Sequence, residues 1–169
     1  MLYVRKIKES SWFNGQESLD SDSISDISTT NHELSVWKVA DDKSNLDNII
    51  LALALTRDDT NGFYFVFIDD KDLAKEYKWE ITTNDQDGDT AYQAMKGEHK
   101  NFEIKNIWDQ GFLAEHIYNL LQDENNYGYY DEPKLLSILS SAILDGKITE
   151  DDLKSNNKRK WLNAYKKNK

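Results

Sequence analysis

The residues of this chain that could do chemistry include a histidine set among small polar residues. His32 follows Ser25, Asp26 and Ser28, and a run that alternates apolar and polar residues comes directly after it. A histidine that takes a proton from a serine hydroxyl, with a carboxylate orienting its ring, is typical of nucleophilic catalysis. We therefore take His32, Asp26 and Ser28 as catalytic candidates of a small enzyme. The spacing does not require this role, and a polar cluster that closes the loop before a strand explains the same residues more simply.

The run from Asp85 to Asp89 offers oxygen ligands of the kind that hard cations prefer. Its carboxylates alternate with other residues, and Gly88 supplies a turn. When the run is aligned with a calcium loop through that glycine, the first ligand position holds Thr83 and the twelfth, where a bidentate Glu belongs, holds Ala94. We therefore interpret the run as an acidic turn in solvent and expect no metal, with a cation site as the alternative.

Composition excludes several other kinds of chemistry. The chain has no Cys, which excludes disulfides, thiolate metal sites and cysteine nucleophiles. Its 7 glycines form neither Gly-x-Gly nor Gly-Lys-Ser/Thr, so we expect no nucleotide cofactor and no other cofactor. The longest apolar run, Ile49 to Leu55, is far shorter than the roughly 20 residues of a membrane span. We expect a soluble, cytoplasmic protein without membrane contact or a targeting segment.

Charge is divided unevenly along the chain. The whole chain carries a net charge of −10, and its last twelve residues hold six Lys or Arg and no acid, so residues 1–157 sum to −16. A surface of this sign steers toward basic proteins, as the surfaces of nuclease inhibitors and DNA mimics do, although solubility alone is the simpler interpretation. The carboxylates that we expect to bind such a partner lie in predicted loops: Asp58, Asp59, Asp69, Asp70, Asp85, Asp87 and Asp89.

The basic tail, Lys158 to Lys169, also holds two large aromatic residues, Trp161 and Tyr165. Its cations could bind phosphates while its rings stack on bases. These rings, with Leu153 and Leu162, equally fit the packed face of a helix whose final cations complement the helix dipole. We favour helix packing and expect nucleic-acid binding to be weak at most, because the acidic body repels nucleic acid. An acidic partner, or the protein's own acidic body, remains an alternative contact for the tail.

The first part of the chain reads as an α/β unit. Residues 2–7 and 34–39 have the alternation of strands, with Leu34 and Val36 on one face of the second strand and Trp37 and Val39 on the other. A helix over 45–57 then leads to a fully apolar strand over 63–68. Strand, helix and strand in this order predict a right-handed crossover with a parallel pair. Further elements are expected as a short helix over 21–28, a helix over 71–77 and a strand over 79–82.

The second part reads as helical. An amphipathic helix is expected over 107–123, with Ile107 on its inward side, and a helix over 133–144 is bounded by Pro133 and Gly146. A last helix begins at Thr149 and runs into the tail. The predicted fold class is α/β, with α+β as the alternative: a small mixed sheet with a crossover helix in residues 1–104, followed by a helical unit in residues 105–169. We expect both to pack as one compact body.

The segment from Ile24 to Val39, with Thr29-Thr-Asn and Leu34-Ser-Val-Trp, resembles a group of short uncharacterised bacterial proteins. These proteins share a Thr-Thr-Asn and Leu-Ser-x-Trp pattern followed by an Ala/Leu-rich helix, which matches residues 46–55 here. The resemblance covers about residues 1–80. It implies no activity and no site.

These observations leave three function hypotheses. The leading one is a non-enzymatic binding protein of the immunity, inhibitor or defence-accessory type, which engages a basic protein partner. The second is the small enzyme that uses His32 with Asp26 and nearby Ser or Thr. The third is a structural subunit of a larger complex, anchored by exposed aromatic residues: Trp12, Trp37 or the tyrosines at 127, 129 and 130.

Overall fold

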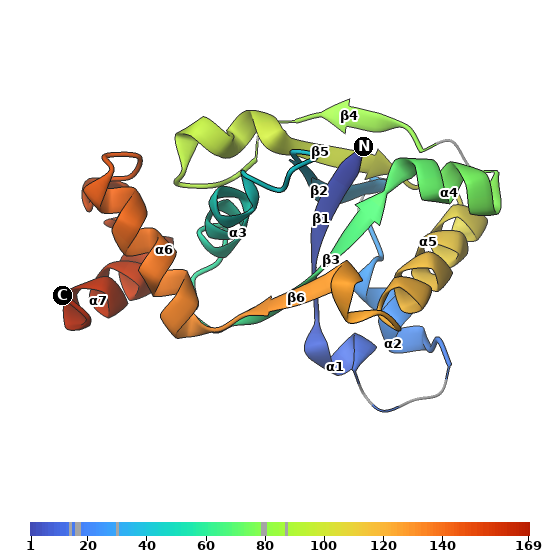
Figure 1. Cartoon of the computed structure of the whole chain (residues 1–169), viewed down its shortest axis with the longest axis horizontal. Helices are drawn as coiled ribbons and strands as arrows, with labels where there is room; N and C mark the ends of the chain where they lie inside the picture. The colour runs from blue at the N-terminus through green and yellow to red at the C-terminus, as the bar shows by residue number, and fades with distance from the viewer. Residues whose placement is uncertain (14, 16–17, 30, 79–80, 87) are drawn as a thin grey trace.

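A computed structural model of the chain describes residues 1–169 except 14, 16–17, 30, 79–80 and 87. Its centre is a six-stranded antiparallel sheet in the order β4-β5-β2-β1-β3-β6 (Figure 1). The strands are β1 (Leu2–Ile7), β2 (Glu33–Val39), β3 (Phe63–Asp69), β4 (Thr83–Asp85), β5 (His99–Glu103) and β6 (Tyr127–Tyr130).

Helices flank this sheet. The α-helices are α1 (Glu9–Trp12), α2 (Ser21–Asp26), α3 (Leu46–Ala54), α4 (Asp70–Tyr77), α5 (Ile107–Leu120), α6 (Glu132–Leu144) and α7 (Arg159–Lys167). Short 3₁₀ turns are η1 (Gln93–Glu98), η2 (Glu124–Asn126), η3 (Asp151–Leu153) and η4 (Asn156–Lys158). The predicted mixture of sheet and helix, with a helical C-terminal part, is confirmed.

The pairing within the sheet differs from the predicted crossover. β1 lies between β2 and β3 and pairs with both in antiparallel ladders, so β2 and β3 run in the same direction without touching as neighbours. The predicted parallel pair is therefore wrong, and so is the mixed sheet, because every pairing among the described residues is antiparallel. The physical reason is that the first strand of the chain inserts between the two strands that α3 connects.

Two apolar cores lie on opposite faces of the sheet, and the alternation of β2 assigns its residues to them as predicted. Leu34 and Val36 belong to one core, whereas Trp37 and Val39 belong to the other. α3 covers the face of Trp37, with α6 packed on α3 and α7 on α6, and α5 covers the opposite face together with α2 and α4 (Figure 1). The molecule is thus built in layers around one sheet.

Several predicted boundaries change. The helix expected from Thr149 is replaced by η3 and η4, and only α7 is a regular helix. The strand expected over 79–82 falls partly on residues outside the described part of the chain, and β4 begins at Thr83. β6 lies where the sequence predicted no strand, and it pairs with β3 and completes the sheet edge. The division at residue 104 stays a prediction.

The aromatic residues of the tail are packed. Trp161, Leu162 and Tyr165 are buried on the inner side of α7, which confirms the helix-packing interpretation. Among the described residues, none of the helices is long and apolar enough to cross a membrane.

Candidate functional site

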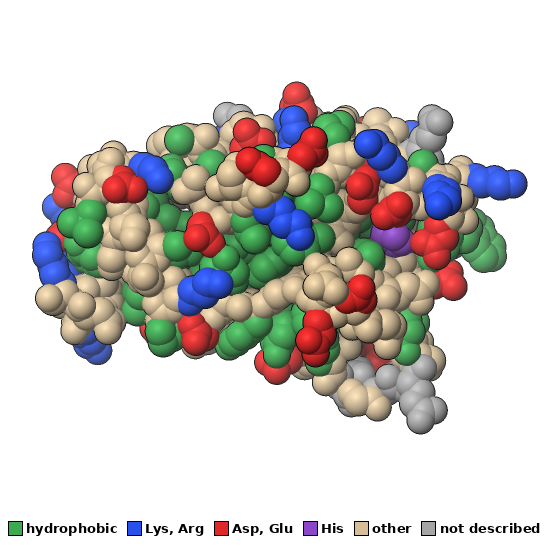
Figure 2. Space-filling model, in the orientation of Figure 1, with side chains coloured by type: hydrophobic (Ala, Val, Ile, Leu, Met, Phe, Trp, Pro, Cys, Tyr) green, Lys and Arg blue, Asp and Glu red, His purple; other side chains and the backbone are tan. Residues whose placement is uncertain are grey.

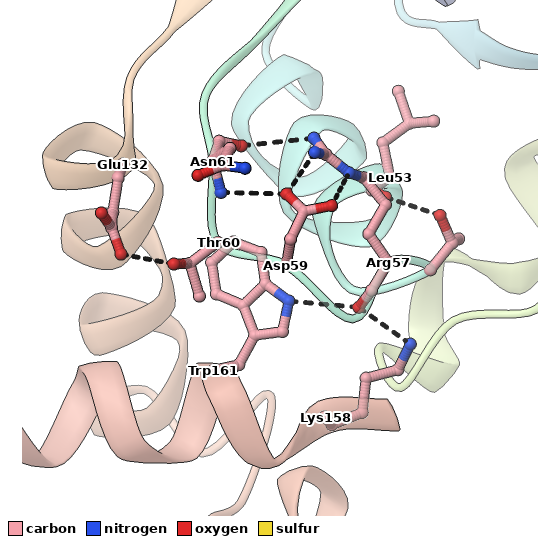
Figure 3. Close-up of polar contacts among 9 residues, drawn as sticks. Leu53, Arg57, Asp59, Thr60, Asn61, Glu132, Lys158 and Trp161 are labelled. Carbon is pink, nitrogen blue, oxygen red and sulfur yellow. Dashed lines mark hydrogen bonds and ion pairs between the residues drawn. The ribbon is translucent and has the colours of Figure 1, made fainter. Parts of the chain in front are cut away.

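Most of the carboxylates expected to bind a partner are already paired within the protein. Asp59 receives two bonds from the guanidinium of Arg57, one of them at 3.2 Å from Nε (Figure 3). Burial acts to raise the pKa of Asp59, but the bonds and the charge of Arg57 outweigh it and lower that pKa below its usual value. Asp85 lies 2.7 Å from Lys100 Nζ, and this hydrogen bond lowers the pKa of the Asp85 carboxyl.

Asp69 and Asp70 lie at the start of α4. Asp69 caps this helix by accepting from the Lys71 N–H at 3.0 Å, and both carboxylates lie at the amino group of Met1, that of Asp69 at 3.5 Å. Both carboxylates thus have partners within the chain. Asp87 lies outside the described residues.

The remaining two, Asp58 and Asp89, are exposed and face the basic tail. Burial lowers the pKa of Lys158, while the charges of Asp89 and Asp58 act in the opposite direction. Figure 3 shows how the tail is fastened here: Trp161 Nε1 and Lys158 Nζ both donate to the carbonyl oxygen of Arg57, at 3.3 and 3.4 Å. The first base of the tail therefore contacts the protein's own acidic body, one of the alternatives left open above.

Acidic and basic side chains are interspersed over the face drawn in Figure 2, and that face shows no single acidic patch. The six described carboxylates of the predicted set thus do not form one free surface that is ready for a basic partner. A surface that binds a basic partner therefore needs a different anchor residue.

The catalytic candidates around His32 do not meet. The exposed His32 ring donates through Nδ1 to the carbonyl of Ile104 at 3.1 Å. Asp26 accepts from Trp12 Nε1 at 2.8 Å, and the Ser28 hydroxyl donates to a backbone carbonyl of α2 at 3.4 Å. The structure describes all three residues, and no hydrogen bond joins His32 to Asp26 or to Ser28. The enzyme hypothesis based on them stays an untested prediction.

The aromatic anchors that we expected are mostly buried. Trp12 and Trp37 are only 8% and 1% exposed, and Tyr130 is buried as well. Tyr129, on the edge strand β6, is the exposed member of the expected set. The anchor hypothesis is therefore wrong for the two tryptophans, because β2 and the segment after β1 place them in the cores.

Among the described aromatic residues, Trp108, in the first turn of α5, is the most exposed. Trp108 is 72% exposed and its neighbour Ile107 is 66% exposed. Asn106 fixes the start of this helix, because its side-chain oxygen accepts from the Trp108 N–H at 2.9 Å. The expectation that Ile107 points inward is wrong: at about 100° per residue it lies roughly 120° around the helix from the buried Leu113.

The outer face of α5 carries a hollow next to Trp108. Its volume is about 460 Å³, and it is lined by Ser18, Leu19, Trp108, Gly111, Phe112, Glu115, Tyr118 and Asn119. The helical positions 108, 112, 115 and 119 fall on one stripe, opposite the residues that pack on the sheet. Sequence reasoning missed Trp108, but its position on the helical wheel, away from Leu113 and Ile117, was a signal that could have found it.

The segment that contains α5 is acidic. Residues 105–126 contain Lys105 as their one Lys or Arg, against Asp109, Glu115, Asp123 and Glu124, which sums to −3 with His116 neutral. Glu115 is exposed and lines the hollow itself. The outer face of α5 thus combines an exposed indole with an apolar hollow and an exposed carboxylate, that of Glu115.

No protein family, curated protein or solved structure matches this chain.

Proposed function

We propose that this protein is a binding protein of the immunity or inhibitor type, and that it engages a basic protein partner through the outer face of α5. The observation that carries the proposal is the 72% exposure of Trp108 beside an apolar hollow that the exposed Glu115 also lines. Tryptophan is enriched among the residues that dominate binding energies, and exposed apolar patches mark interaction sites.

The energetic argument begins with the indole. A tryptophan side chain buries about 150–250 Å² when it enters an interface. At about 25 cal/mol per Å² this contributes on the order of 4–6 kcal/mol before the losses of rotational and side-chain freedom. Ile107 adds apolar area directly beside it. This first turn is therefore a suitable centre for an interface.

The charge of the chain indicates what kind of partner would bind this surface. Residues 1–131 sum to −14, whereas residues 132–169 sum to +4, so the acidic part of the chain is the part that holds α5. A partner segment with an apolar side chain flanked by Lys or Arg would place its apolar group in the hollow and its cations near Glu115 and Asp109. Long-range attraction would then raise the association rate at low salt.

The experiment compares three immobilised proteins in capture from a cell extract: wild type, Trp108→Ala and Leu144→Ala. Leu144 is a matched control because it is an apolar side chain that is 84% exposed, at the far end of α6. We expect one basic protein to be retained by wild type and by Leu144→Ala, and lost from Trp108→Ala and at high salt.

With that protein purified, titration calorimetry should show that Trp108→Ala raises the Kd by about 30-fold, which corresponds to about 2 kcal/mol. Equal retention by all three proteins contradicts the proposal. Retention of an acidic protein, or retention that is insensitive to salt, contradicts it as well.

A further inference from the structure

A second site lies on the other face of the sheet and is independent of the α5 surface. Ser35 on β2 and His99 on β5 are 64 positions apart, yet Ser35 Oγ lies 2.7 Å from His99 Nε2. Both line a pocket of about 310 Å³ that is completed by Trp37, Leu53, Thr56, Gln86 and Asp89. Ser35 is exposed whereas His99 is buried, so the hydroxyl is the accessible member of the pair.

The hydrogen bonds of His99 determine its tautomer. His99 Nδ1 lies 2.8 Å from the carbonyl oxygen of Gln86. Because a carbonyl oxygen only accepts, Nδ1 carries the hydrogen, and in the neutral ring Nε2 is then the acceptor. The Ser35 hydroxyl therefore donates to Nε2. This order of nucleophile, base and orienting acceptor is the one that activates serine in acyl transfer, here with a backbone carbonyl in the orienting position.

Neighbouring residues hold the Ser35–His99 pair in this arrangement. Burial lowers the pKa of His99, against the opposing effect of the Gln86 carbonyl, and this favours the neutral ring that can accept a proton. Asn101, which is opposite Ser35 in the β2–β5 ladder, donates to the Gln86 side chain and holds the segment that carries the orienting carbonyl. Gly88 permits the close approach of that segment, since a Cβ at this position would lie 2.6 Å from the Trp37 ring.

We propose that Ser35 is a nucleophile activated by His99, and that the pocket accepts small, uncharged carboxylic esters. The residues that line the pocket indicate the class of substrate. Trp37 and Leu53 are apolar, Thr56 offers a hydroxyl, and the carboxylate of Asp89 disfavours anions. The pocket volume of about 310 Å³ lies near the lower end of the range for ligand pockets, which restricts the substrate to small molecules.

In the first step, Ser35 Oγ forms a bond to the ester carbonyl carbon while its proton passes to His99 Nε2. The bond from that carbon to the alcohol oxygen then breaks, and the alcohol leaves with the proton returned by His99. A water molecule attacks the acyl-Ser35 ester with His99 again accepting its proton. The carboxylic acid is released, and the Ser35 hydroxyl is restored.

The test uses a fluorophosphonate probe, which forms a stable bond from phosphorus to an activated serine oxygen and releases fluoride. Wild-type protein is incubated with the probe, and the adduct is located by peptide mass spectrometry. We expect one adduct, on Ser35, that forms at least about 100-fold more slowly in His99→Gln, because a general base contributes at least that factor. An excess of 4-nitrophenyl acetate should slow the labelling of wild type.

Ser141→Ala is the matched control, since this serine is exposed on α6 and does not line the proposed pocket. It should label like wild type, whereas Ser35→Ala should not label. Circular dichroism checks that the variants fold. An adduct on another serine, or none, overturns the proposal, as does equal labelling of a folded His99→Gln. If His99→Gln does not fold, the wild-type protein still tests the proposal: an adduct on Ser35 supports it, and an adduct elsewhere or none overturns it. In the overturned case, the Ser35–His99 bond only joins two strands.

Discussion

His116 shows at the scale of single residues how much a buried polar group depends on one partner. Its side chain is only 4% exposed, and its Nδ1 lies 3.1 Å from Glu76 Oε2 on α4. The other ring nitrogen, Nε2, is buried without a hydrogen bond in the described part of the protein. Glu76 is therefore the side chain that satisfies this ring, and its loss would leave both nitrogens without partners.

We predict that Glu76→Ala lowers the free energy of unfolding by about 1–3 kcal/mol, the cost of a buried polar group that loses its bond. Urea denaturation followed by fluorescence measures the change. Glu76→Gln is the matched control, because its amide oxygen can still accept from Nδ1, and it should lose much less. Equal losses in the two variants would show that the charge of Glu76, and not the hydrogen bond, stabilises this contact.

α6 shows how the ends of a single element are specified. Asp131 accepts from the Lys134 N–H at 2.9 Å, and Pro133 occupies the first turn. At the other end Gly146 has a φ of 70°, and the Lys147 N–H donates to the Ala142 carbonyl at 2.9 Å. This is the Schellman arrangement, in which a residue of left-handed conformation ends the helix.

At the scale of the element, Gly146→Ala should therefore lower the free energy of unfolding by about 1 kcal/mol, because an L side chain strains the left-handed conformation. Gly97→Ala provides the comparison. An added Cβ meets nothing within 4 Å at either glycine, but the backbone of Gly97 does not have a positive φ. Thermal unfolding should separate the two variants, and an equal Tm would mean that the helix end tolerates the strain.

At the scale of the whole molecule, the C-terminal helices are fastened to the sheet unit through the loop after α3. Trp161 is fully buried and donates to the Arg57 carbonyl, and the Thr60 hydroxyl donates to Glu132 of α6 (Figure 3). One apolar core includes residues of the sheet, α3, α6 and α7. This continuity predicts that the sheet and the C-terminal helices unfold together.

Trp161→Ala should lower the free energy of unfolding by about 3–5 kcal/mol and keep a single transition. Trp108→Ala removes the same side chain from an exposed position and should change that free energy by no more than about 0.5 kcal/mol. Urea unfolding, followed by both circular dichroism and tyrosine fluorescence, makes the comparison. A transition that splits in two for Trp161→Ala would show that residues 105–169, or part of them, fold as a separate unit.

The sequence by itself determined those features that depend on neighbours in the chain. The alternation from Leu34 to Val39 predicted which core each side chain joins, and Pro133 with Gly146 predicted the extent of α6. The spacing of Trp161, Leu162 and Tyr165 indicated a packed helix face, which the structure confirms. Periodicity and capping are local, so a single sequence carries them.

Only the tertiary structure decided what depends on distant pairing. The insertion of β1 between β2 and β3 involves strands about 30 to 60 residues apart, and hydrogen bonding between strands leaves no local pattern that specifies the neighbour. The same holds for Ser35 and His99, which meet only because β2 pairs with β5. The helical wheel separates Trp108 from Leu113 and Ile117, but the packing of α5 on the sheet decided which of these faces is buried. Both proposed sites therefore arise from the way the elements are packed, and not from a motif in the sequence.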